Sequence, residues 1–224
     1  IKGNIELTKV DKDYPDNKLT GAEFEVYADT NGDGKLDNDD KLLGTMTELD
    51  GGVYQMKELR YGKYLVREKT APTGFVLDEN VYSVSIEENG KTYIVENEAG
   101  VGFVNAAQKG SLKIVKTSSD GKIEGFSFRV TGADGYDQTF KTDKNGEIYI
   151  EGLRIGEYTV SEVNDSVSAG YILPADKQAM VKVGATTIVE MHNELRDTPK
   201  TGDDFNLALW VSLAAASVLG AGVL

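Results

Sequence analysis

Gly62-Lys63-Tyr64-Leu65-Val66-Arg67-Glu68 is the stretch that decides the fold of this chain. Side chains along a β-strand point alternately to opposite faces, so Tyr64, Val66 and Glu68 share one face. The pattern returns as Gly156-Glu157-Tyr158-Thr159-Val160-Ser161-Glu162, again with a glutamate at the end of an apolar face. A strand with this unusual acidic end, occurring twice, indicates an internal duplication.

Short runs of alternating apolar and polar residues recur outside these two strands. They include residues 5–9, 24–27 and 82–86, and Gly, Asn and Asp residues separate them. Such runs are typical of half-buried antiparallel strands. No amphipathic helix of three or more turns is predicted before the C-terminal segment. The 25 Gly and 4 Pro residues fit the turns of a β-sandwich better than a Pro-rich stalk.

The order of the other features repeats as well. The matching pieces are residues 7–9 with 114–116, 21–24 with 125–128, and 103–105 with 191–193. We therefore predict an all-β protein of two tandem Ig-like β-sandwich domains, residues 1–107 and 108–195, followed by a C-terminal hydrophobic transmembrane helix within residues 196–224. The join at residues 108–110 is too short for a flexible linker, so the domains are expected to stack end to end.

Composition excludes several classes of function. The net charge of −13 and the pI near 4.6 argue against a nucleic-acid partner, which requires a basic patch. The chain has no Cys, so disulfides cannot stabilise it. No nucleophile triad, phosphate loop or catalytic metal spacing is present, so neither enzyme activity on a substrate nor an organic cofactor is expected.

The C-terminal segment points to the cell envelope. It contains Thr198, Pro199, Lys200, Thr201 and Gly202 in succession. Two acidic residues follow, and then an uncharged apolar run over residues 205–224, close to the roughly 20 residues that cross a bilayer as a helix. The block resembles the cell-wall sorting signal of Gram-positive surface proteins, usually LPxTG, with Thr198 in place of Leu.

That resemblance implies a membrane-anchored precursor that a sortase cleaves between Thr201 and Gly202. The Thr201 carbonyl would then join an amine of a peptidoglycan precursor or of a neighbouring pilin, and fix the protein covalently at the cell surface. The family carries a basic tail after the apolar run, whereas this sequence ends at Leu224, so a trimmed chain and a plain membrane anchor both stay open. Ile1 in place of Met suggests that the true N-terminus lies upstream.

The duplicated domains each contain a lysine, a glutamate and an asparagine in the same order. With Leu7-Thr8-Lys9, the 62–68 strand, Ala71-Pro72-x-Gly74-Phe75 and Asn105, the sequence resembles two CnaB-type (SpaA-like) pilin and adhesin domains in tandem. The second copy lacks the Ala-Pro-x-Gly piece after its glutamate. The resemblance implies an intramolecular Lys–Asn isopeptide bond promoted by the glutamate in each domain. The residues are Lys9, Glu68 and Asn105, and Lys116, Glu162 and Asn193.

Strand alternation supports this assignment independently, because each of these residues shares a face with apolar neighbours. Burial is expected to lower the pKa of a lysine and to raise that of a glutamate, which yields a neutral nucleophile and a carboxylic acid that can polarise the Asn carbonyl and shuttle protons. The reaction is a single-turnover self-modification. The alternative is a buried Lys–Glu ion pair with Asn as hydrogen-bond partner, or lysine ends that reach solvent.

An acidic loop in the first domain suggests a cation site. Residues 29–40 follow the EF-hand-type spacing, with Gly at the sixth position and Asp in place of the usual Glu at the twelfth. The predicted structural calcium ligands are Asp29, Asn31, Asp33, Lys35 through its carbonyl, Asp37 and Asp40. The alternative is a solvated acidic turn, because Asn-Gly and Asp-Gly are ordinary turn dipeptides.

Together these features predict a structural surface protein, either a pilin subunit or the wall-proximal stalk of an adhesin. Two alternatives stay open. In the first, a loop at a sandwich end itself binds a host or matrix component; in the second, the chain displays an enzyme that lies upstream.

Overall fold

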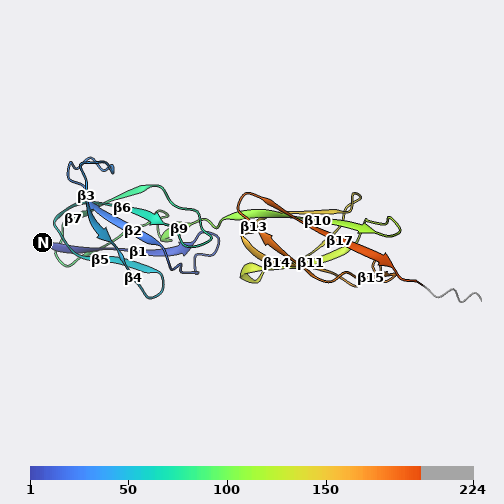
Figure 1. The fold of residues 1–224 in the computed structure, drawn as a ribbon. Coiled ribbons are helices and arrows are strands. Elements are labelled where there is room, and N and C mark those ends of the chain that lie inside the picture. Colours follow the sequence, from blue (N-terminus) through green and yellow to red (C-terminus); the bar gives the residue numbers. More distant parts are fainter. Residues whose placement is uncertain (198–224) are drawn as a thin grey trace, which may run out of the picture.

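The computed structural model describes residues 1–197, and the predicted sorting signal and apolar run lie outside them. Two β-sandwiches lie end to end along one axis (Figure 1). The predicted all-β class and the two sandwiches are confirmed. In residues 1–197 the one helix is the 3₁₀ turn η1 (Ala133–Gly135), and no helix is long and apolar enough to span a bilayer.

The first domain packs two sheets face to face. Its strands are β1 (Lys2–Asp11), β2 (Glu23–Ala28), β3 (Lys41–Thr45), β4 (Thr47–Leu49), β5 (Val53–Arg60), β6 (Gly62–Thr70), β7 (Val81–Ile86), β8 (Thr92–Ile94) and β9 (Phe103–Asn105). One sheet has the order β4-β5-β1-β8, with β9 also paired to β1, and the other has the order β3-β2-β6-β7. The strand that carries Glu68, β6, is therefore central in its sheet.

The second domain repeats this arrangement. Its strands are β10 (Lys109–Ser118), β11 (Ser127–Thr131), β12 (Asp137–Lys141), β13 (Glu147–Arg154), β14 (Gly156–Glu162), β15 (Tyr171–Ile172), β16 (Lys177–Val181) and β17 (Thr186–Leu195). The sheets have the orders β13-β10-β17-β15 and β12-β11-β14-β16. Three residues separate the end of β9 at Asn105 from the start of β10 at Lys109, so the junction has no long linker.

Each domain has its own apolar core between its two sheets. In the first core, the Phe24 ring meets the Tyr54 and Phe103 rings edge to face, with centroids 5.1 and 5.0 Å apart. In the second, Phe126 meets Tyr171 in the same way at 5.3 Å. Such contacts add to the burial of large apolar surfaces. The predicted alternation is confirmed in β1 and β10. The core-facing side chains of these strands are buried up to and including Lys9 and Lys116, respectively.

Strand register shows that the two domains place their polar residues identically. In each, the first and last strands run parallel, and the lysine lies opposite the residue two positions before the asparagine. In each, the glutamate lies opposite a phenylalanine of the second strand. The register pairs are Lys9–Phe103 and Phe24–Glu68, and Lys116–Met191 and Phe128–Glu162. Internal duplication thus extends from the sequence to the backbone pairing.

Candidate functional site

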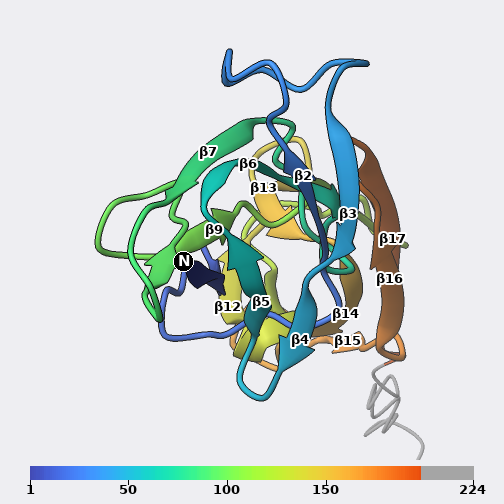
Figure 2. The same cartoon turned by 90° about the vertical axis from the view of Figure 1, so that its left-hand side faces the viewer.

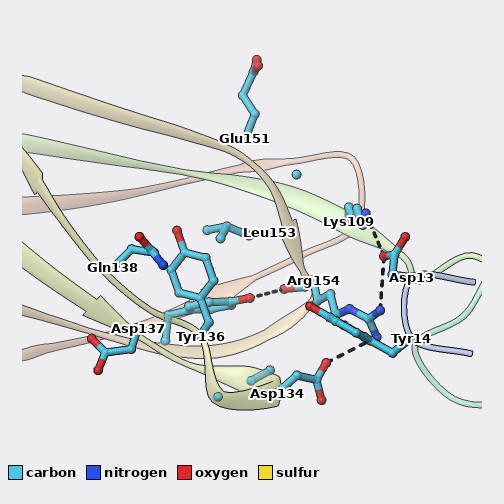
Figure 3. Close-up of a pocket in the computed structure, with 14 residues that line it drawn as sticks. Asp13, Tyr14, Lys109, Asp134, Tyr136, Asp137, Gln138, Glu151, Leu153 and Arg154 are labelled. Atoms are coloured by element: carbon cyan, nitrogen blue, oxygen red, sulfur yellow. Dashed lines mark hydrogen bonds and ion pairs between the residues drawn. The ribbon is translucent and has the colours of Figure 1, made fainter. Parts of the chain in front are cut away.

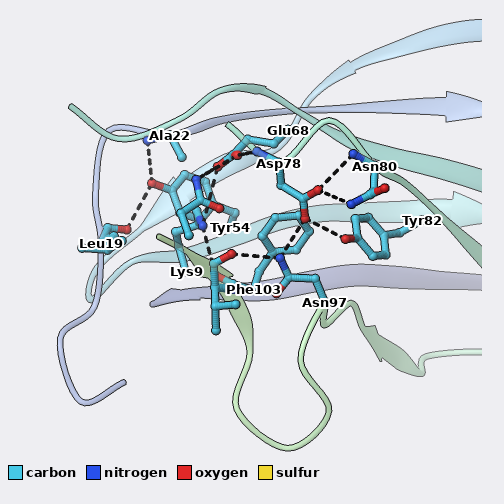
Figure 4. Close-up of polar contacts among 12 residues, drawn as sticks. Lys9, Leu19, Ala22, Tyr54, Glu68, Asp78, Asn80, Tyr82, Asn97 and Phe103 are labelled. Atoms are coloured by element: carbon cyan, nitrogen blue, oxygen red, sulfur yellow. Dashed lines mark hydrogen bonds and ion pairs between the residues drawn. The ribbon is translucent and has the colours of Figure 1, made fainter. Parts of the chain in front are cut away.

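The lysine of the first domain is fully buried in the core. Lys9 has no solvent exposure, and its Nζ donates to the carbonyl of Phe103 at 3.1 Å. The same Nζ lies 3.6 Å from Glu68 Oε1 and 5.0 Å from the centre of the Phe103 ring. Figure 4 shows Lys9 between Glu68 and Phe103. The solvent-reaching alternative for Lys9 is therefore excluded in this structure.

Glu68 also contacts the asparagine. Asn105 Nδ2 donates to both carboxylate oxygens at 2.9 Å, and the backbone N–H of Asp78 donates to Oε2 at 2.8 Å. Asn105 Oδ1 is buried and has no hydrogen-bond partner in the described part of the chain. The amide nitrogen of Asn105, rather than its carbonyl oxygen, thus faces the Glu68 carboxylate. A 180° rotation of the amide group would exchange the two atoms. One carboxylate touches both the amine and the amide.

Burial lowers the pKa of Lys9 to about 8, although the charges of Glu68 and Asp78 favour the ammonium form. Relative to the reference value of 10.5, this shift corresponds to a cost of about 3 kcal/mol for keeping the ammonium in the core. A neutral amine is therefore accessible at mildly alkaline pH. Loss of the charge by conversion to an amide would remove the cost altogether.

Asp78, which the sequence analysis did not single out, organises the loop that supports Glu68. Its Oδ2 accepts hydrogen bonds from Tyr82 Oη at 2.7 Å and Asn97 Nδ2 at 2.8 Å (Figure 4). Its Oδ1 accepts the backbone N–H of Asn80 at 3.0 Å. Burial acts to raise the pKa of Asp78, but these hydrogen bonds outweigh it and keep that pKa below its usual range. The network fixes the segment whose N–H holds Glu68.

The second domain brings its triplet together less completely. Lys116 and Asn193 are buried, and Asn193 Nδ2 donates to Glu162 Oε1 at 2.6 Å. Lys116 Nζ donates instead to the carbonyl of Thr117 at 2.5 Å and lies 4.2 Å from the centre of the Phe126 ring. Within residues 1–197, Glu162 Oε2 and Asn193 Oδ1 are buried without partners.

Burial shifts both titrating groups of this second triplet toward neutrality. It lowers the pKa of Lys116, against the charges of Glu162 and Asp120. It raises the pKa of Glu162, against the hydrogen bond from Asn193 and the charge of Lys116. Both pKa shifts have the direction expected from burial.

The predicted calcium ligands lie in the loop between β2 and β3, which projects from the sandwich (Figures 1 and 2). Backbone N–H groups of the loop donate to side-chain oxygens of Asn31, Asp33, Asp37 and Asp40. Asp29 Oδ2 accepts the N–H of Gly34 at 3.2 Å, while its buried Oδ1 has no partner in the described residues. In residues 1–197 no three His, Cys, Asp or Glu side chains are grouped closely enough to hold a metal ion. The oxygen donors suit Ca²⁺, but they do not converge in this conformation.

The predicted sortase residues, Thr198, Pro199, Lys200, Thr201 and Gly202, lie outside the described residues. The sorting signal therefore stays a prediction from sequence.

Comparison with known proteins agrees with the duplication. A family model described as SpaA, a prealbumin-like fold domain, matches residues 3–99 and again residues 110–195. No curated protein matches the chain.

Solved structures show similar folds. The Bacillus anthracis TIE protein is 27% identical with a TM-score of 0.66, over 87% of this chain and 34% of that one, so this chain spans about a third of its length. The C-terminal fragment of pilus adhesin SpaC from Lactobacillus rhamnosus GG is 14% identical with a TM-score of 0.54, over 88% of this chain and 99% of that one. GBS52, the minor pilin of Streptococcus agalactiae, is 15% identical with a TM-score of 0.40, over 90% and 99%.

Proposed function

Because this chain belongs to the SpaA family of prealbumin-like fold domains, we propose that it is a structural cell-surface protein whose two domains each form an internal Lys–Asn isopeptide bond. It serves as a pilin subunit or as the stalk of an adhesin. The observation that carries the proposal is the repeated buried triplet, which has the same strand register in both domains.

The chemistry in the first domain follows from the contacts of Glu68. Neutral Lys9 Nζ attacks Asn105 Cγ, a new C–N bond forms, and the Cγ–Nδ2 bond breaks to release ammonia. The proton that Nζ loses must reach Nδ2, and Glu68 lies 3.6 Å from the first atom and 2.9 Å from the second. Glu68 therefore relays this proton as general base and then general acid. The fold supplies the proximity that makes the attack intramolecular.

We expect the released ammonia to leave the first domain beside Asn105. A cavity of about 360 Å³ lies beside the triplet and is lined by Asp78 and Asn105 together with the half-exposed Leu77. Release of the leaving group to solvent makes the step effectively irreversible, because the bulk concentration of ammonia is low.

The bonds suit a load-bearing role. Each would join the first strand of a domain to its last strand and close a loop of roughly 100 residues or somewhat fewer. By analogy with disulfides, such closure stabilises by about 4 to 5 kcal/mol. A pull along the chain would then pass through the bond between the terminal strands and bypass most of the sandwich.

Intact-mass measurement of the purified chain tests the proposal. We expect the mass to be lower than the sequence mass by two ammonia molecules. In Glu68→Ala the mass deficit should shrink to one ammonia molecule, because the first-domain bond does not form. In Glu58→Ala, changed on the exposed surface of the same domain, the deficit should stay at two. A full sequence mass for the unmodified chain would overturn the proposal, and ammonia loss in the first domain of Glu68→Ala would remove the relay role.

We also propose that a sortase joins Thr201 to the cell wall or to a neighbouring pilin. The support is the Thr-Pro-Lys-Thr-Gly stretch followed by an acidic pair and an apolar run. Incubation with a sortase and a labelled amine should attach the label at Thr201, and Thr201→Ala should abolish the attachment. Label on the unchanged chain at any other residue would contradict the assignment.

For the β2–β3 loop we propose structural calcium binding. The support is the spacing of oxygen donors and the buried Oδ1 of Asp29, which has no hydrogen-bond partner among residues 1–197. Calorimetry should detect calcium binding that Asp37→Asn weakens strongly and that Asp39→Asn, outside the predicted ligand set, leaves nearly unchanged. An absence of calcium heat, with no change in melting temperature on chelation, would eliminate the site.

A further inference from the structure

The end of the second domain that faces the first domain is built around one arginine. Arg154 Nη1 and Nη2 lie 2.7 and 2.9 Å from the two carboxylate oxygens of Asp11, and Nη2 lies 3.2 Å from Asp13. The guanidinium also lies over the Tyr14 ring, 4.8 Å from its centre. Figure 3 shows Arg154 between Asp13, Tyr14 and Asp134 at the junction. Bidentate, largely buried Arg–carboxylate pairs fix orientation as well as contributing energy.

The lysine at the start of the second domain completes this contact. Lys109 Nζ lies 3.0 Å from Asp13, so two cations of one domain meet two aspartates of the other. The side chain of Asp11 is 1% exposed and that of Arg154 is 15% exposed. The junction is therefore a specific interface between the Asp-bearing end of one domain and the Arg-bearing end of the next.

The first domain carries the same Arg-bearing end. Lys2 lies opposite Arg60 in the β1–β5 ladder, as Lys109 lies opposite Arg154 in the β10–β13 ladder. The carbonyls of Arg60 and Arg154 each accept a hydrogen bond from the tyrosine four residues later, at 2.6 and 3.0 Å.

The chain also enters the two domains by the same path. The N–H of Tyr61 donates to the carbonyl of Ile1 at 3.1 Å, and the N–H of Ile155 donates to the carbonyl of Gln108 at 3.1 Å. Residues 1 and 108 are therefore equivalent entry points. A domain attached before Ile1 would approach Arg60 as the first domain approaches Arg154.

At the first domain, however, this end is uncovered. Figure 2 looks onto it, with the N-terminus toward the viewer. Arg60 is exposed, and within residues 1–197 it forms no ion pair. Ile1 is 62% and Tyr61 67% exposed, and the one ion pair of Lys2 among the described residues is with Glu58 at 2.8 Å. Two cations and two large apolar side chains are thus presented without an opposing surface.

A second copy of this chain does not supply the missing surface. Its Asp11 end is already occupied by Arg154. The far end of its second domain has Ser118 at the position of Asp11, because each lies opposite the reactive asparagine in the parallel ladder. Asp120, at the position of Asp13, already accepts the hydroxyls of Ser118 and Tyr171, both at 2.7 Å. The complementary partner therefore has an Asp-bearing end like that of the first domain. In this chain, the Asp11 end is occupied by Arg154, and the equivalent end of the second domain lacks one of the two aspartates.

We propose that the Arg60 end of the first domain is an interface that receives the Asp-bearing end of a further SpaA-type domain preceding Ile1 in the chain. The occupant has two aspartates two residues apart and an aromatic ring beside them, as at Asp11, Asp13 and Tyr14. The same contact would then repeat along the molecule and set the angle between successive domains. This inference does not depend on the isopeptide chemistry.

The test attaches a second copy of residues 1–107 directly before Ile1 of the full chain, so that Ile1 takes the place of Gln108. The chain has no Cys, so single Cys spin labels at Glu79 of the added copy and of the original domain report one distance. We expect a narrow distance distribution. Arg60→Ala should broaden it at least twofold, and Lys57→Ala, an exposed cation on the same strand, should not.

A charge exchange separates specific docking from loss of folding. Arg60→Asp in the original domain, combined with Asp11→Arg in the added copy, should restore the narrow distribution that Arg60→Asp alone loses. In the chain without the added copy, Arg60→Ala should leave the melting temperature unchanged. An unaltered distribution in Arg60→Ala would overturn the proposal, and so would Arg60-dependent dimerisation of the original chain in ultracentrifugation, because it would make the occupant a second copy.

Discussion

The two domains share their fold, strand register and Lys–Glu–Asn triplet, yet their glutamates are held differently. Glu68 lies within 3.6 Å of the Lys9 amine and accepts both Asn105 and the Asp78 N–H. In residues 1–197 the Glu162 carboxylate accepts one hydrogen bond, from Asn193, and the amine of Lys116 donates to a backbone carbonyl instead. Strand pairing brings the lysine, glutamate and asparagine of each domain together. In the first domain, a loop outside the sheets then orients the glutamate carboxylate.

That loop differs between the copies in sequence. After Glu68 the chain continues through Ala71-Pro72-Thr73-Gly74, and the backbone of Asp78 returns to the carboxylate. After Glu162 the chain forms a different turn, in which Asp165 N–H donates to Ser168 Oγ at 2.9 Å, and Glu162 Oε2 receives no donor in residues 1–197. We therefore expect the second bond to form more slowly than the first.

The largest effect is expected from removal of the first-domain amine. Lys9→Met should restore one ammonia to the intact mass and lower the stability of the first domain by about 4 to 5 kcal/mol, because the loop closure is lost. Lys116→Met should cost the second domain nearly as much, since loop length enters only logarithmically. Calorimetry with mass measurement checks both. A melting profile unchanged in Lys9→Met would show that no bond constrains the first domain.

The next largest effect is a pH dependence of stability, expected only in protein whose first-domain isopeptide bond cannot form. Asn105→Ala leaves Lys9 as a free amine with a pKa of about 8 in the fold against 10.5 as the reference. Between these values the unfolded chain binds more protons than the folded one, so stability rises with pH across this window, by about 3 kcal/mol in total. Below pH 8 both states are protonated and the slope vanishes.

The matched control for this titration is Lys9→Met/Asn105→Ala, which lacks the amine. Urea unfolding at pH 7.5, 9 and 10.5 should show the rise in Asn105→Ala and not in the double variant. Identical pH profiles for the two variants would contradict the burial of a titrating Lys9.

A smaller effect distinguishes the two Arg-bearing ends. Arg154→Ala should destabilise the junction by about 2 kcal/mol, because charge-assisted hydrogen bonds to the buried Asp11 are lost. Arg60→Ala in the same chain should change stability by less than about 0.5 kcal/mol, as is usual for an exposed side chain. Small-angle scattering should show a more flexible pair of domains only for Arg154→Ala. Equal behaviour of the two variants would contradict the interface.

The smallest expected effect tests the supporting loop. Asp78→Ala removes the acceptor of Tyr82 and Asn97 but keeps the backbone N–H that reaches Glu68. A looser loop should slow formation of the first bond about tenfold, toward the rate of the second domain, which corresponds to about 1.4 kcal/mol in the barrier. Time-resolved mass measurement follows it, and an unchanged rate would show that the side-chain network is not required.

Sequence patterns were sufficient for the fold and for the burial of the lysine, glutamate and asparagine in each domain. Alternation along Tyr64, Val66 and Glu68 fixes which face is buried, and the repeat fixes which lysine and asparagine share it. Asp78 could not be predicted, because both its backbone N–H and its carboxylate act from a loop ten residues beyond Glu68. The periodicity of a strand does not indicate which later loop folds back against it.

The domain junction escaped prediction for a related reason. Alternation along a strand predicts which residues are buried inside a domain. It does not predict which residues contact a neighbouring domain at the end of the sandwich. Arg60 and Arg154 do occupy equivalent positions two residues before the repeated Gly-x-Tyr piece, so aligning the copies further would have marked them. Only the structure shows that Arg154 is paired with Asp11, whereas Arg60 is exposed and forms no ion pair within residues 1–197.

The most direct test of the account is a time course of cross-linking in freshly synthesised chain, read by peptide mass mapping. We expect the peptide joining Lys9 to Asn105 to appear first and the peptide joining Lys116 to Asn193 to follow. Both should reach completion without any added enzyme. Absence of the Lys9–Asn105 peptide, or its appearance only after the second, would contradict the claim that the carboxylate of Glu68 aligns the faster of two self-forming bonds.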